Sequence, residues 1–270
     1  ISLSGENPRP NNDLVLIQPR VPFNFATPES MIDTVFMGFG IENRGQVDQP
    51  NVSASAMLSG TNGDSFSTTE TTDSLASDST VFFFFDESFV PSGIGDYTIG
   101  YNTSSDSTDA DPDDNIGGAT FTITEDVFSK DDGNIVSATQ PQDIGDDFWE
   151  IGNYYVAPNG GYQAYEADIS VASNGMAHQG QMVTVFLYEV TEDDQPEFTD
   201  DDLTVRGFGE HEFTTEENFA LVTVELFDLI EGTQGIELIE GAEYFLTIQY
   251  TPEMVSPFSD LDYYYDVATV

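Results

Sequence analysis

Apolar residues recur at every second position along much of this chain, and this period decides which folds are open to it. In the segment Thr34–Glu42 (TVFMGFGIE), every second residue from Val35 to Ile41 is apolar, and the segments 52–58, 97–101 and 119–123 repeat the alternation. Because neighbouring side chains of a β-strand point to opposite faces of a sheet, these segments are predicted to be half-buried strands. We find no long helical period with capping residues, so the expected fold class is all-β.

The segment Val81–Phe85 (VFFFF) departs from this alternation. A continuous apolar strand is typical of one that is covered on both faces. The covers expected here are the core on one side and, on the other, the Ser/Thr-rich hairpin or loop of residues 59–80. The alternative is an exposed aromatic face that serves as a protein–protein interface. The residues of that interface would be Phe82, Phe83, Phe84 and Phe85.

The spacing of the strands predicts two tandem β-sandwich domains. Seven or so strands within about 115 residues are typical of an immunoglobulin-like sandwich, which we place at residues 1–127. The polar segment 128–146, which contains Gly and Pro, is expected to be a linker. Six further strand patterns follow it, so residues 147–270 are predicted to form a second sandwich. Since the chain begins at Ile1 and ends in a strand-like segment, we expect a piece of a longer protein, with the second domain cut at its C-terminal end.

Charge and cysteine content exclude several functions. The chain has 50 Asp and Glu against 5 Lys and Arg, a net charge of −45, and no Cys. Nucleic acids and anionic membrane surfaces are bound mainly through basic residues, so neither is an expected partner. The lack of Cys excludes disulfides and thiolate chemistry, and no apolar run is long enough for membrane insertion as a helix. The acidity itself has two open explanations, which are ion binding and a salt-adapted proteome.

A group of oxygen-bearing side chains within one predicted turn suggests a cation site. Its members are Asp109, Asp111, Asp113 and Asn115. Hard carboxylate and amide oxygens are the ligands that Ca²⁺ prefers, and the spacing of the three Asp matches the start of an EF-hand loop. The match then ends, because Asp114 stands where that loop needs Gly and Thr120 where it needs Glu. A calcium site and a solvated acidic loop therefore both remain open.

No catalytic residues are predicted. The two histidines, His178 and His211, lie in polar segments, and no Gly-x-Ser-x-Gly motif occurs. Fifty acids leave a carboxylate-pair glycosidase open, although nothing singles out such a pair. Several tyrosines could stack on sugars, including Tyr165 and Tyr263 to Tyr265, and the predicted binding set is Tyr154, Tyr155 and Tyr162. Tyrosines of this kind are more often half-buried strand positions.

Two family resemblances bear on function. Ile41–Gly45 followed by Pro50–Val52, with the later Asp111–Asn115 before a strand, resembles CARDB-type domains. These are immunoglobulin-like, adhesion-related modules of bacterial and archaeal surface proteins, and the resemblance covers about residues 12–126. The second half is similar to jelly-roll-like modules of large secreted proteins of Bacteroidota, on the segments Gly152–Tyr155 and Leu238–Tyr244. Neither resemblance implies an active site.

The function expected from these observations is non-enzymatic. The resemblances imply a structural or adhesive module of a secreted or cell-surface protein, such as a subunit of an extracellular appendage or filament in a salt-tolerant microbe. Its partners would be other protein subunits or further domains of the same chain, and Ca²⁺ is the one cofactor expected. The alternative is a glycan-binding accessory module of a secreted hydrolase, with cell-surface glycans as partners.

Overall fold

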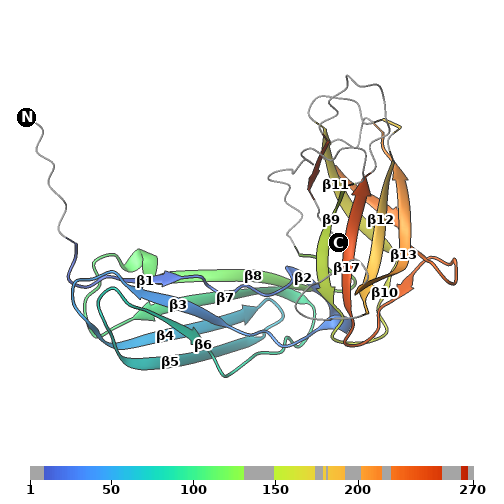
Figure 1. Ribbon diagram of the computed structural model, residues 1–270. Helices are drawn as coiled ribbons and strands as arrows, with labels where there is room; N and C mark the ends of the chain where they lie inside the picture. The colour runs from blue at the N-terminus through green and yellow to red at the C-terminus, as the bar shows by residue number, and fades with distance from the viewer. Residues whose placement is uncertain are drawn as a thin grey trace, which may run out of the picture. The chain divides into compact units, whose positions relative to one another are not determined.

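The protein is all-β, as predicted (Figure 1). The computed structural model describes residues 9–130, 149–173, 179–180, 182–191, 202–214, 220–250 and 263–266. These residues form strands and short 3₁₀ helices and contain no α-helix. Accordingly, the described chain holds no helix that is long and apolar enough to cross a membrane. Two compact units can be distinguished: Ile1–Phe25 with Ile32–Thr124, and Ala26–Met31 with Glu125–Val270.

The first unit is a seven-stranded sandwich of the immunoglobulin-like kind. One sheet has the order β1 (Leu14–Ile17), β3 (Gly38–Asn43), β6 (Thr80–Phe84). The other contains, in order, β8 (Ile116–Thr124), β7 (Gly95–Ser104), β4 (Gln49–Gly60) and β5 (Ser65–Leu75). All neighbours within these two groups are antiparallel. The alternating residues face inward and form one core, which includes Met37, Phe39, Ile41, Val52, Leu58, Tyr97, Ile99, Tyr101 and Phe121.

Strand β6 alternates, contrary to the prediction that both of its faces are covered. Phe83 is 6% and Phe85 4% exposed, whereas Phe82 is 47% and Phe84 64% exposed. The predicted cover is missing because Ser65–Leu75 extends as β5 in the other sheet, paired with β4. The outer rings instead cover glycines of β3. A Cβ at Gly40 would lie 2.8 Å from a ring carbon of Phe82 and one at Gly38 3.2 Å from a ring carbon of Phe84, an arrangement known as aromatic rescue of glycine.

The turn between β4 and β5 is closed by a single carboxylate. Asp64 accepts hydrogen bonds from the Ser92 N–H (2.8 Å) and hydroxyl (2.7 Å), the Tyr97 hydroxyl (2.9 Å) and the Asn62 amide (3.2 Å). These donors, the backbone N–H of Ser92 first, lower the pKa of Asp64 to about 2. The network joins the β4–β5 turn to the chain segment that leads into β7.

We expect Asp64→Asn to lower the melting temperature of the first unit at neutral pH. A carboxylate whose pKa is lowered by folding contributes stability above its unfolded pKa, and this contribution is lost as the pH falls toward the folded value. The parent chain should therefore become less stable between about pH 4 and pH 2. The variant should lose less stability over the same range. Thermal melts across that range measure the difference. Equal pH profiles for parent and variant would contradict the assignment, and Asp73→Asn, at an exposed acid on β5, serves as the control.

The second unit is also built from packed sheets. Its largest sheet has the order β15 (Phe227–Asp228), β13 (Leu203–Glu212), β12 (Met182–Val190), β17 (Glu243–Tyr250), β9 (Trp149–Val156). A second has the order β14 (Ala220–Glu225), β11 (Glu166–Ser173), β18 (Tyr263–Asp266), and β10 (Gln163–Ala164) pairs with β16 (Ile236–Glu237). One core joins these sheets and includes Ile169, Val183, Val185, Val222, Val224, Leu226, Ile236, Tyr244 and Ile248.

The first residues of the predicted linker, 128–146, belong to the second unit. Phe128 is 7% exposed within its core. Ser129 exchanges two backbone hydrogen bonds with Ala26 of β2 (Ala26–Pro28), and Met31, which ends the 3₁₀ helix η1 (Glu29–Met31), joins the same core. Residues 131–148 of the predicted linker lie outside the described residues. The jelly-roll topology expected of this half stays a prediction.

Candidate functional site

Three carboxylates meet at one end of the first unit. One oxygen each of Asp13, Asp109 and Asp114 lies within 4.8 Å of the others. Asp13 precedes β1, whereas Asp109 and Asp114 come from the segment between β7 and β8, where Asp114 lies in the 3₁₀ helix η2 (Pro112–Asn115). In Figure 1, η2 and β1 lie at the same end of the sandwich, and the two elements contact one another.

Hydrogen bonds hold the acidic segment against the start of β1. The N–H of Leu14 donates to Asp109 Oδ2 at 2.8 Å, and the N–H of Asp111 donates to Asp109 Oδ1 at 2.9 Å. The N–H of Ala110 donates to the carbonyl of Asn12 at 3.1 Å. These bonds fix the carboxylate of Asp109, and one oxygen each of Asp13 and Asp114 lies within 4.8 Å of it.

The electrostatics of this cluster are unfavourable for three negative charges. Burial first, and then the neighbouring Asp109, raises the pKa of Asp13. Burial first, and then Asp111, raises the pKa of Asp114. Arg44 lowers both pKa values, but its guanidinium is bonded to Glu42 at 2.8 Å. A bound cation would offset the repulsion that remains.

Two buried oxygens beside the cluster have no hydrogen-bond partner among the described residues. They are Oδ1 of Asp114 and Oδ1 of Asn115, and Asn115 as a whole is only 5% exposed. A buried acceptor without a partner costs about 1–3 kcal/mol. A hard cation accepts carboxylate and amide oxygens as ligands and would remove this cost. The donor set consists of oxygens without nitrogen or sulfur, which fits Ca²⁺ and does not fit Zn²⁺.

The structure rearranges the predicted cation site. Asp109 belongs to the carboxylate cluster and Asn115 lies beside Asp114, but Asp111 and Asp113 are exposed and are not among the three that converge. Asp13 was not among the predicted cation ligands. No local spacing could reveal it, because Leu14 and Asp109, which join the two segments, are 95 residues apart.

The second unit has a groove of about 600 Å³. It is bordered by Glu125 and Asp126 on one segment and by the run from Gly161 to Glu166, with Asp168, on another. The hydroxyl of Tyr162 donates to the carbonyl of Asp126 at 2.6 Å and so ties the two segments together. Burial raises the pKa of Tyr162 to about 12.

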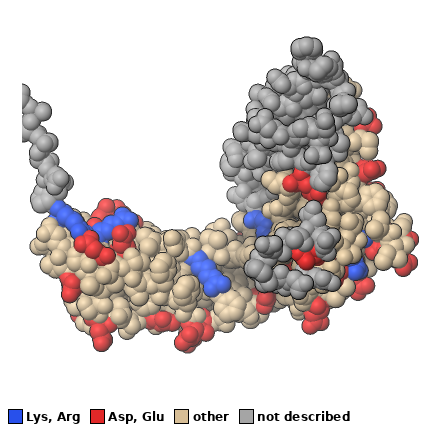
Figure 2. All heavy atoms as spheres, viewed as in Figure 1, with Lys and Arg blue, Asp and Glu red and all other residues tan. Residues whose placement is uncertain are grey.

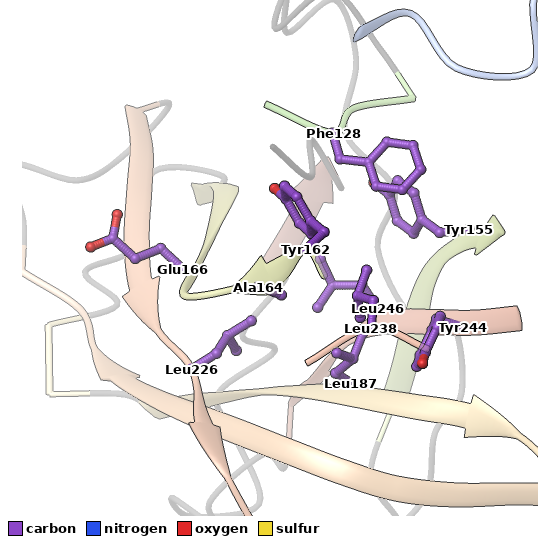
Figure 3. Close-up of a pocket in the computed structure, with 10 residues that line it drawn as sticks. All are labelled: Phe128, Tyr155, Tyr162, Ala164, Glu166, Leu187, Leu226, Leu238, Tyr244 and Leu246. Carbon is purple, nitrogen blue, oxygen red and sulfur yellow. The ribbon is translucent and has the colours of Figure 1, made fainter. Parts of the chain in front are cut away.

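An apolar cavity of about 40 Å³ lies next to this groove (Figure 3). Tyr162 and Glu166 line both the groove and the cavity. Figure 3 shows the Glu166 carboxylate directed away from the apolar side chains, whereas the rings of Phe128, Tyr155 and Tyr162 lie together at one end of the cavity. Tyr162 therefore separates a dry interior from a polar surface.

The three tyrosines predicted to bind sugar do not form one surface. Tyr155 is 5% exposed and packs on Phe128 with ring centroids 5.0 Å apart. Tyr154, its neighbour on β9, packs instead on Phe245 at 5.2 Å. Tyr162 alone of the three borders the groove. Tyr165, which was also named from the sequence as able to stack on a sugar, is 50% exposed and borders the groove as well.

His211 is not part of these sites. His211 lies on β13 and packs against Phe213, with ring centroids 5.2 Å apart. His178 lies outside the described residues. The carboxylate cluster of the first unit offers oxygen ligands to a cation.

Comparisons with known proteins give only distant matches. No family model and no curated protein matches this chain. Among solved structures, a CARDB domain from Pyrococcus furiosus, in complex with di-metal ions, is 17% identical and has a TM-score of 0.32, over 44% of this chain and 93% of that one. The secreted serine protease VesC from Vibrio cholerae is 10% identical with a TM-score of 0.24, over 95% of this chain. The chain spans 50% of the length of VesC.

Proposed function

We propose that this chain is a non-enzymatic structural module of a secreted or cell-surface protein, and that Ca²⁺ binds its first unit at Asp13, Asp109 and Asp114. The observation that carries the proposal is the convergence of these carboxylates beside the buried, unpartnered Oδ1 of Asn115. A cation at this point ties the start of β1 to the segment between β7 and β8. It thereby stabilises the terminal strand of the sandwich without taking part in a reaction.

The test is a calcium titration followed by calorimetry, with Asp13→Asn as the variant. Because Ca²⁺ binds the folded state and the unfolded chain has no preformed site, binding raises the free energy of unfolding. A first unit whose stability is the same in Ca²⁺ and in chelator would contradict the proposal.

The outer face of β6 is proposed as the contact between copies of this module. Phe82 and Phe84 are stacked, with ring centroids 6.3 Å apart and planes inclined by 12°. β6 is the last strand in the order β1-β3-β6, so its outer edge offers backbone groups for strand addition. An exposed aromatic pair on such an edge suits a second copy of the same strand.

We expect the double variant Phe82→Ser/Phe84→Ser to reduce self-association of the chain. Light scattering across a concentration series in seawater-like salt should give a rising molar mass for the parent and a constant one for the variant. Met57→Ser, at a residue that is 66% exposed on the other sheet, controls for the loss of a surface hydrophobic residue. A parent chain that stays monomeric at all concentrations would overturn this part of the proposal.

A further inference from the structure

Tyr165 forms an aromatic platform on the wall of the groove in the second unit. A Cβ at Gly235 would lie 2.6 and 2.9 Å from two carbons of the Tyr165 ring, so this ring rests directly on the backbone of that glycine. Gly235 has φ +96°, a conformation that other residues rarely adopt. Half of the Tyr165 surface nevertheless remains exposed, at 50%. The platform is thus supported from below and open to a ligand.

Polar groups next to the platform are held in fixed orientations. The Tyr165 hydroxyl donates to Gln163 Oε1, which leaves the amide nitrogen of Gln163 as its donor group. The Thr223 hydroxyl donates to Asp168 Oδ1 at 2.5 Å and orients that carboxylate. Gln163, Tyr165 and Asp168 all line the groove. A ligand therefore meets an aromatic ring, an amide donor and a carboxylate acceptor without having to order them first.

We propose that this groove binds a neutral sugar chain, with one pyranose ring stacked on Tyr165 and its hydroxyls bonded to Gln163 and Asp168. The apolar C–H face of a sugar matches an open tyrosine ring, and its hydroxyls can donate to a carboxylate and accept from an amide. The volume of about 600 Å³ lies within the range of about 300–1,000 Å³ typical of small-molecule sites.

The charge of the groove restricts the class of sugar. The described residues that line it include Glu125, Asp126, Glu166 and Asp168 and no Lys or Arg, so uronic or sulfated chains are repelled. Carboxylates alone do not identify a ligand here, because Figure 2 shows Asp and Glu at many places on the visible face of both units. The glycine-backed ring is the feature that distinguishes this place, and it favours a sugar over a basic peptide.

Affinity electrophoresis of the full chain tests the proposal, with laminarin, mannan and hydroxyethyl cellulose as neutral probes. Alginate is the acidic probe and polylysine the cationic one. We expect at least one neutral polysaccharide to retard the chain, equally at low and high salt, and alginate to have no effect. Tyr165→Ala should weaken this binding by about tenfold or more, as for truncation of an aromatic anchor. Tyr165→Phe, which keeps the ring, should stay within about threefold of the parent.

Phe23→Ala is the matched control, because it removes an aromatic residue that is 60% exposed in the first unit, and it should bind as the parent does. Thermal melts confirm that each variant is folded. The proposal is overturned if no neutral polysaccharide binds, or if folded Tyr165→Ala binds as well as the parent. Retardation by polylysine alone, lost as salt is added, would also overturn it and assign the groove to a basic partner.

Discussion

Addition of Ca²⁺ at low ionic strength is expected to raise the melting temperature of the first unit, and Asp13→Asn to abolish this rise. The carboxylates of Asp13, Asp109 and Asp114 lie within 4.8 Å of one another, and their mutual repulsion is present only in the folded state. A divalent cation replaces this repulsion by attraction. At a Ca²⁺ concentration 100 times the Kd, binding stabilises the folded state by about 2.7 kcal/mol, which calorimetry detects readily.

The variants distinguish a specific site from general screening of a chain with net charge −45. Without Ca²⁺, Asp13→Asn should be at least as stable as the parent, because it removes one of the repelling charges. Asp113→Asn removes a charge from η2, the 3₁₀ helix that also contains Asp114, at an exposed residue outside the cluster. This variant should keep the full rise in melting temperature on addition of Ca²⁺. Equal responses in both variants would show that Ca²⁺ acts only by screening. Mg²⁺ at the same ionic strength controls for divalent charge alone.

The pH dependence of the first unit should change when Ca²⁺ binds. Folding raises the pKa values of Asp13 and Asp114, so the folded state holds protons more tightly than the unfolded chain does. Stability then falls as the pH rises from the ordinary Asp value of about 3.9 through these raised values. Ca²⁺ requires the ionised carboxylates and should flatten this fall. Melts in chelator and in Ca²⁺ across the same pH range measure it.

The all-β class could be predicted because period-two alternation depends only on local sequence. Residues 220–231 (ALVTVELFDLIE) show this well, since a helix could have been assigned to them, yet the alternation of Leu221 to Phe227 corresponds to β14 and β15. The exposure of Phe82 and Phe84 could not be predicted in this way. It depends on which sheet the preceding hairpin joins and on the two glycines of β3 that the rings cover, and both are tertiary facts.

The same distinction between local sequence and tertiary contacts applies to the residues of the candidate sites. Asp109 and Asn115 were predicted because they lie in one acidic turn, whereas Asp13 enters the cluster only through the contact between β1 and η2. The platform at Tyr165 depends on Gly235, which lies in a different segment of the second unit. A list of tyrosines gives no indication of which ring is supported on one side and open on the other.

Truncation of Phe128 should strongly destabilise the second unit, although sequence composition placed this residue in a linker. Phe128 is 7% exposed and packs on Tyr155 and Tyr162 with ring centroids 5.0 and 6.3 Å apart. It also lines the apolar cavity behind the groove. Removal of a buried Phe ring costs about 3–5 kcal/mol, because the transfer free energy is lost and a larger cavity remains.

Calorimetry of Phe128→Ala in the whole chain measures this loss. The response to Ca²⁺ identifies which unfolding transition belongs to which unit. The transition that Ca²⁺ raises belongs to the first unit and should be unchanged in the variant, whereas the other transition should move to lower temperature. Phe84→Ala, a truncation of the same size at a residue that is 64% exposed, should cost less than about 1 kcal/mol. A second-unit transition that is unaffected by Phe128→Ala would mean that residue 128 is linker after all. A decrease of the expected size would instead place the start of the second unit ahead of Phe128, with its ring in the wall of the apolar cavity.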